Sequence, residues 1–201
     1  MANPPPLAYG AYYHICSRGV GGEDLFREKR NFTYFLDRYA HYVEPVAATY
    51  AYCLLRNHFH VFVRTYTVDE QRERVGGVLP ATWRPLSPSR QFALLFGTYA
   101  QAYNKAYGRS GSLFEHPFRR VQVEREAHFA RLVVYIHRNP QHHGFVEDFA
   151  SWRHSSYRAH LSSGPTRLRR DDVLAWYGGR EGFVEAHRVD REVDDAALRV
   201  E

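Results

Sequence analysis

Hydrophobic and polar positions alternate along four short stretches of this chain, and alternation of this kind predicts β-strands. The predicted strands are "AYYHICSRGV" (11–20), "VAATYAYCLLRN" (46–57), "HFHVFVRT" (58–65) and "SLFEHPFRRVQVE" (112–124). The second and third stretches join at Arg56 and Asn57, which predicts a hairpin with a tight turn at these two residues.

Three other stretches place their apolar residues at helical spacing. The predicted helices are "LFREKRNFTYFLDRYAHYVE" (25–44), "SRQFALLFGTYAQAYNKAYG" (89–108) and "REAHFARLVVYIHRN" (125–139). The second begins at a serine cap and ends at Gly108. The third is expected to stop at Asn139, because Pro140 cannot continue a helix.

The resulting order is strand, helix, strand, strand, helix, strand, helix. Its first six elements are the βαββαβ arrangement of the ferredoxin-like fold, an α+β class with an antiparallel sheet, helices on one face and the other face open. We expect one domain over residues 1–150, with a surface insertion at 66–89, and a partly irregular extension over 151–201. The last ~20 residues are polar enough to be partly disordered.

The third strand carries two histidines on one face. In an extended strand His58, His60 and Phe62 point to one side, while Phe59 and Val61 point to the other. The Cα atoms of the two histidines should be roughly 6.5 to 7 Å apart, so both rings could bind one cation. From these two residues alone, a pair of partly exposed surface histidines is the commoner case.

The last predicted helix could supply further groups to the same place. Tyr135 and Asn139 are four residues apart and share a helix face, whereas His137 points elsewhere. If that face looks at the sheet, a phenol and an amide reach the histidines. The ordinary alternatives are a core tyrosine and a helix C-cap.

Composition adds a compartment and a class of partner. The chain of 201 residues is 44% hydrophobic and has neither a signal peptide nor a membrane-length apolar run, so a cytoplasmic protein is expected. Cys16 and Cys53 lie in separate strands and are expected to be reduced core thiols. The net charge is +5, and apart from Lys29 and Lys105 the basic side chains are arginines, which suit a polyanion.

Taken together, "NHFHVFV", "GRSGSLFEHPFRRVQVE", "VVYIHRNPQHHGFV" and "WRHSSY" resemble the REP-associated tyrosine transposases. These are relatives of the single-strand insertion-sequence transposases that carry an HUH motif. The resemblance runs from Tyr12 to Tyr157 in the family's order. It departs from the family in the long 66–89 insertion and in Gln141, His142 and His143, which replace small or basic residues.

The resemblance implies a metal-dependent nuclease that cuts and rejoins single-stranded DNA at hairpins called REP palindromes. His58 and His60 match the HUH pair, Tyr135 the nucleophile that keeps the 5′-phosphate, and Asn139 the third metal ligand. The implied metal is Mg²⁺ or Mn²⁺, and the softer donors favour Mn²⁺. No general base is fixed by the sequence, because His137 and Glu124 could both be surface residues.

DNA would be held by arginines with interleaved aromatic and hydroxyl side chains. The expected DNA-binding residues are Arg18, Lys105, Arg109, Arg119, Arg120, Trp152, Arg153, Ser155, Ser156 and Tyr157. A solvated arginine face and a tryptophan that fills a core gap are the ordinary alternatives. We expect a nucleoid-associated protein without a membrane partner, and a monomer rather than a homodimer.

Two other functions are compatible with parts of the sequence. A two-histidine phosphoesterase needs two H-x-[S/T] motifs, and "HFH" lacks the hydroxyl, so this class is rejected. A ferredoxin-like nucleic-acid-binding module without cleavage activity remains the alternative, against which the presence of all four site residues argues.

Overall fold

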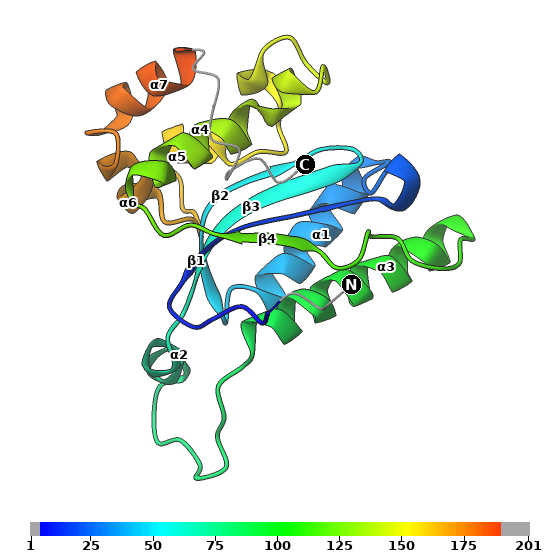
Figure 1. The fold of residues 1–201 in the computed structure, drawn as a ribbon, viewed down its shortest axis with the longest axis vertical. Helices are drawn as coiled ribbons and strands as arrows, with labels where there is room; N and C mark the ends of the chain where they lie inside the picture. The colour runs from blue at the N-terminus through cyan, green and yellow to red at the C-terminus, as the bar shows by residue number, and fades with distance from the viewer. Residues whose placement is uncertain (1–4, 190–201) are drawn as a thin grey trace.

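The computed structural model describes residues 5–189 and shows an α+β fold built on one antiparallel sheet (Figure 1). The sheet has four strands in the order β2-β3-β1-β4. The strands are β1 (Tyr12–Arg18), β2 (Ala47–Leu54), β3 (His58–Thr65) and β4 (Arg119–Gln122). This order and the antiparallel pairing confirm the predicted βαββαβ arrangement of the first six elements.

The predicted hairpin forms between β2 and β3. The Leu55 amide donates to the His58 carbonyl at 2.8 Å, which closes a turn over the two intervening residues. The register places Cys53 opposite His60 and Leu54 opposite Phe59. The tight turn sets this register. A shift of one residue would move each histidine to the other face of the sheet, so the turn also determines the face on which the histidines lie.

One face of the sheet packs on α1 (Lys29–Tyr42) and α3 (Pro88–Tyr107), as predicted (Figure 1). Phe59, Val61 and Val63 point into this core. The Ser87 side chain caps α3 with Pro88 as its first residue, and Gly108 ends the helix in the left-handed conformation that glycine favours.

The opposite face is not open, and the expectation of helices on one face only was wrong. It is covered by α4 (Ala127–His142), α6 (Arg170–Ala175) and α7 (Arg180–Arg188). Ala51 and Phe62 on this face are fully buried beneath them. A sheet with apolar side chains on both faces requires such a second layer, since exposed it would leave this apolar surface in water.

Helix α4 does not end at Asn139 as expected but continues to His142, with Pro140 in its last turn. A proline so close to the end removes a single intrahelical hydrogen bond, and the His143 amide still bonds the Asn139 carbonyl at 3.0 Å. The remaining short helices are η1 (Val20–Gly22), α2 (Val68–Val75), η2 (Phe149–Ser151) and α5 (Tyr157–Leu161).

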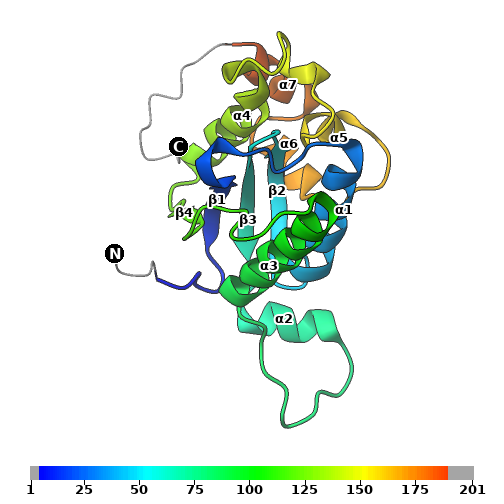
Figure 2. The same cartoon turned by 90° about the vertical axis from the view of Figure 1, so that its right-hand side faces the viewer.

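Helix α2 lies within the predicted 66–89 insertion, and Figure 2 shows it projecting away from the sheet with the loop that follows. Helix α7 was not predicted, because disorder was expected from about residue 182 onwards. The rest of that expectation, over 190–201, lies outside the described residues. Both cysteines are buried, and no helix of the described residues has the length and apolar character needed to cross a membrane.

Candidate active site

His58 and His60 lie in β3 and face α4 rather than solvent. Their side chains are only 4% and 1% exposed, so the alternative of surface histidines does not hold. Across the sheet Arg18 pairs with His58, and Cys16 pairs with His60. The two imidazole centroids are 5.1 Å apart, and the rings are nearly perpendicular.

Each ring is anchored through its Nδ1 atom. His58 Nδ1 lies 2.8 Å from Asn57 Oδ1, and His60 Nδ1 lies 3.0 Å from His14 Nε2. The Nε2 atoms of both rings are buried and have no hydrogen-bond partner among the described residues. Buried polar atoms are normally paired, so two bare nitrogens in one place require an explanation.

Helix α4 brings Tyr135 and Asn139 to the same histidines. The Tyr135 ring centroid is 5.8 Å from that of His60, and its side chain is 4% exposed. The Asn139 Nδ2 atom donates to the Tyr135 carbonyl at 2.9 Å, which turns Oδ1 the other way. Oδ1 is buried without a hydrogen-bond partner among the described residues, and the amide is close enough to raise the pKa of His58.

The types of donor fit a divalent cation. Two imidazole nitrogens and one amide oxygen belong to one buried cluster, and none of the three atoms has a well-formed hydrogen bond among the described residues. Within residues 5–189 there is no group of three histidine, cysteine, aspartate or glutamate side chains placed to hold a metal. A site here therefore needs the amide of Asn139 as well as the two histidines.

Electrostatics keep the two histidines neutral, which is the form that binds metals. Burial lowers the pKa of His58 to about 3, with smaller contributions from His143 and Arg18. Burial also lowers the pKa of His60 well below its usual value, with His14 the next contributor.

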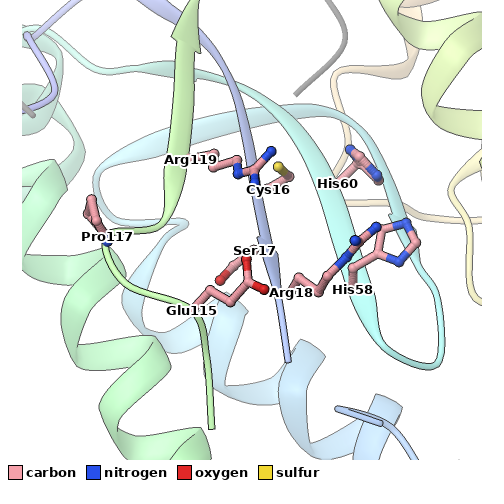
Figure 3. A pocket seen from close by; sticks show the side chains of 8 residues that line it. All are labelled: Cys16, Ser17, Arg18, His58, His60, Glu115, Pro117 and Arg119. Atoms are coloured by element: carbon pink, nitrogen blue, oxygen red, sulfur yellow. The ribbon is translucent and has the colours of Figure 1, made fainter. Parts of the chain in front are cut away.

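A small cavity of about 30 Å³ opens beside the histidines. It is lined by Cys16, Ser17, Arg18, His58, His60, Glu115, Pro117 and Arg119 (Figure 3). In Figure 3 the Arg18 side chain runs from β1 towards the ring of His58. Two arginines and the carboxylate of Glu115 therefore line the cavity beside the neutral histidine pair.

Sequence reasoning missed His14. Its side chain is fully buried and lies beside both His60 and Tyr135, with ring centroids 5.2 Å and 5.9 Å away. Its position in the first predicted strand was visible in the sequence. That position places His14 beside His60 only once the pairing of β1 with β3 is known.

His143 also lies closer to the site than expected. Its ring centroid is 4.6 Å from that of His58, just beyond the end of α4. The sequence singled out this residue only as a departure from the family pattern. By contrast His137 points away, with Nε2 2.7 Å from Ser156 Oγ, and Glu124 is exposed after β4.

The predicted DNA-binding residues fall into separate groups. Arg18 and Arg119 reach the cavity, whereas Arg120 is on the other face with its guanidinium 4.2 Å from the Phe118 ring centroid. Arg109 is engaged by an ion pair with Glu23 at 2.6 Å and by nearby carbonyls. Lys105 is in the last turn of α3, across the sheet from α4.

The second predicted DNA-binding segment is largely structural. Ser155, Ser156 and Tyr157 are buried, and Ser156 Oγ accepts from the Tyr52 amide at 2.9 Å. Trp152 is half-buried and donates from Nε1 to the Leu54 carbonyl at 2.9 Å. Among these residues, Arg153 alone is exposed. The segment attaches the extension to the edge of β2 and leaves Arg153 to face solvent.

No protein-family model matches the chain, and no curated protein matches it. Among solved structures the chain is similar to a REP-associated tyrosine transposase bound to a REP hairpin, with a TM-score of 0.52 and 15% identity. The match covers 82% of this chain and 87% of that chain. At this identity the likeness concerns the fold, an α+β arrangement with a four-stranded antiparallel sheet, which is the fold of the family that the sequence resembles.

Proposed function

We propose that this protein is a metal-dependent single-stranded DNA endonuclease and strand transferase that acts through a 5′-phosphotyrosine. One observation carries the proposal: Tyr135 and Asn139 in α4 meet His58 and His60 in β3 in one buried cluster. The sequence resemblance and the likeness to a transposase fold support the same activity.

His58, His60 and Asn139 would hold the ion, through two Nε2 atoms and one Oδ1 atom. Held there, Mg²⁺ or Mn²⁺ would supply charge neutralisation at a non-bridging phosphate oxygen and would help to orient the phosphodiester for in-line attack. The protein contributes ligands whose directions are already set, because Asn57, His14 and the Tyr135 carbonyl fix their other ends.

Tyr135 is the proposed nucleophile. Its hydroxyl loses a proton, its oxygen forms a bond to phosphorus, and the bond from phosphorus to the 3′ oxygen breaks. The leaving oxygen takes up a proton to give a 3′-hydroxyl. The reverse attack by a 3′-hydroxyl rejoins strands and restores the tyrosine, so no nucleotide cofactor is consumed.

The proposed substrate is single-stranded DNA that contains REP-type hairpins. Arg18 and Arg119, which line the cavity, would bind the phosphates that flank the cleaved bond. Arg153 is available further away, and Lys105 only if DNA also wraps around the far face. Arg109, Arg120, Trp152 and the buried residues 155–157 act in the fold and are not part of the proposed DNA surface.

We also propose that the protein works as a monomer. The Leu54 amide donates to the His154 carbonyl and the Arg169 amide to the Thr49 carbonyl, both within one chain. The extension thus occupies the β2 edge, through which a second sheet could otherwise pair. In such a monomer helix α4 packs on the sheet of its own chain, and one protomer supplies both the nucleophile and the histidines.

The test is cleavage of single-stranded oligonucleotides that span palindromes near the gene, in Mn²⁺ or Mg²⁺, analysed on denaturing gels. We expect a cleaved strand and a covalent protein–DNA band, both absent in EDTA and in the Tyr135→Phe and His58→Ala variants. Tyr52→Phe is the matched control, since this tyrosine on β2 packs against the core on the other face.

A wild-type protein that binds the hairpin but forms no adduct with either metal would refute the catalytic proposal. The function would then be that of a nucleic-acid-binding module. An adduct that persists in Tyr135→Phe would instead retain the activity and reject the nucleophile.

A further inference from the structure

His14 packs beside both a proposed metal ligand and the proposed nucleophile. It lies in the middle of β1, its side chain is fully buried, and its ring contacts those of His60 and Tyr135. We infer that His14 is a positioning residue, which holds His60 in the tautomer whose Nε2 lone pair is available to a metal. This inference rests on the function proposed above.

The hydrogen bond between the two rings leaves only two arrangements. His14 Nε2 and His60 Nδ1 are 3.0 Å apart, and in two neutral rings one proton lies between them. If the proton is on His60 Nδ1, the Nε2 atom of His60 is unprotonated and can bind a cation. If the proton is on His14 Nε2, neutral His60 is protonated at its own Nε2 and cannot bind a cation there.

Burial favours the first arrangement. His60 Nε2 has no hydrogen-bond partner among the described residues, so a proton placed there would be a buried donor without an acceptor. An unpaired buried donor is rarer than an unpaired buried lone pair. Because His14 accepts a hydrogen bond from His60 Nδ1, the tautomer of His60 that can bind a metal has its proton hydrogen-bonded even in the absence of an ion.

A second histidine pair in the same molecule supplies the contrast. His137 Nδ1 and His187 Nε2 are 2.9 Å apart, and these rings too are stacked and buried. There the outer nitrogens are both bonded, one to Ser156 Oγ at 2.7 Å and one to the Phe183 carbonyl at 2.7 Å. The pair in the site differs in leaving one nitrogen bare beside a second imidazole, as a metal ligand requires.

The first measurement is the tautomer itself. Long-range ¹H–¹⁵N spectra of the histidine rings in metal-free wild-type protein should show His60 protonated at Nδ1. His14→Phe keeps a buried ring but removes the acceptor, and should move His60 towards the Nε2-protonated form. His14→Gln can accept with its amide oxygen and should keep the wild-type pattern.

The second measurement is Mn²⁺ binding without DNA, followed by the electron paramagnetic resonance signal of free Mn²⁺. His14→Phe should weaken binding by roughly 10- to 100-fold, as is usual when an outer-shell partner of a metal ligand is removed. His14→Gln should restore most of that loss. His187→Phe, which breaks the other buried histidine pair, should leave Mn²⁺ affinity unchanged.

The outcomes separate the two proposals. Unchanged Mn²⁺ affinity in His14→Phe overturns the inference alone, whereas no Mn²⁺ binding by the wild type overturns the inference and the proposed function together. If His14→Phe does not fold, the wild-type spectrum still decides, because a His60 protonated at Nε2 refutes the positioning role.

Discussion

Each proposed metal ligand is directed by a partner on its other side. Asn57, the residue next to His58, bonds its Nδ1, and His14 bonds Nδ1 of His60. Asn139 is directed by its own helix, through the Tyr135 carbonyl one turn earlier. Such partners fix ring tautomers and amide orientation before any ligand binds, so little order has to be gained on binding.

Replacing Asn139 tests whether the amide oxygen is a ligand. We expect Asn139→Ala to weaken Mn²⁺ binding by at least about tenfold, since only two imidazoles would remain. Isothermal titration with Mn²⁺ measures this. Asn104→Ala is the matched control, because Asn104 also donates from Nδ2 to a carbonyl but lies at the end of α3. Equal affinity in the two variants would remove Asn139 from the site.

At the level of residues, the sequence predicted the face on which each side chain lies but not the residues that it contacts. The two-residue period of a strand put His58 and His60 on one face, and the four-residue spacing put Tyr135 and Asn139 together. The role of His14 could not be predicted, because it depends on which strand pairs with β1 and in which register. That pairing is decided by the packing of the whole sheet.

At the scale of elements, β4 shows how one strand serves both layers. Arg119 is opposite Cys16 and shares its face with the histidines, while Arg120 is opposite Ile15 on the core side. Neighbouring arginines that look equivalent in the sequence therefore lie in different surroundings. Arg119 reaches the cavity, and Arg120 stacks over an aromatic ring.

This pair gives a direct test of the DNA surface. Arg119→Ala should weaken binding to a single-stranded DNA hairpin. It should also make the negative slope of the logarithm of the binding constant against the logarithm of salt concentration less steep by about 0.7, the value for one phosphate contact. Arg120→Ala should leave the slope unchanged and lower stability, since it removes a cation–π contact. Fluorescence anisotropy over a salt series distinguishes them, and equal slopes in both variants would exclude Arg119 from phosphate binding.

The elements themselves were predicted where local pattern decides them. Strand β3 has the predicted ends, and α3 ends before Gly108 as expected. The serine that caps α3 is Ser87 rather than the expected Ser89, because Pro88 takes the first helical position. Helix α7 was missed because its stability comes from tertiary packing: Phe183 and His187 are buried under α4, although most of its residues are polar. A polar composition alone therefore did not indicate disorder here.

At the scale of the whole molecule, a sheet covered on both faces buries several histidines. His58, His60, His137, His160 and His187 are all buried, and burial lowers the pKa of each. The last three lie in the layer formed by α4 and the extension. The stability of that layer should therefore depend on pH.

The extension layer should loosen in acid. Burial lowers the pKa of His160 from 6.5 to about 4, so the unfolded chain takes up a proton before the folded one does. The stabilisation is therefore complete above pH 6.5 and is lost as the pH falls towards 4. For His160 alone this is about 1–2 kcal/mol between pH 7.5 and pH 5.

His160→Phe should reduce the pH dependence of the unfolding free energy by that amount, measured by urea denaturation at both pH values. Leu161→Ala, in the same helix but without a titrating group, should lower stability equally at both. If His160→Phe keeps the wild-type pH dependence, protonation of this histidine does not destabilise the fold.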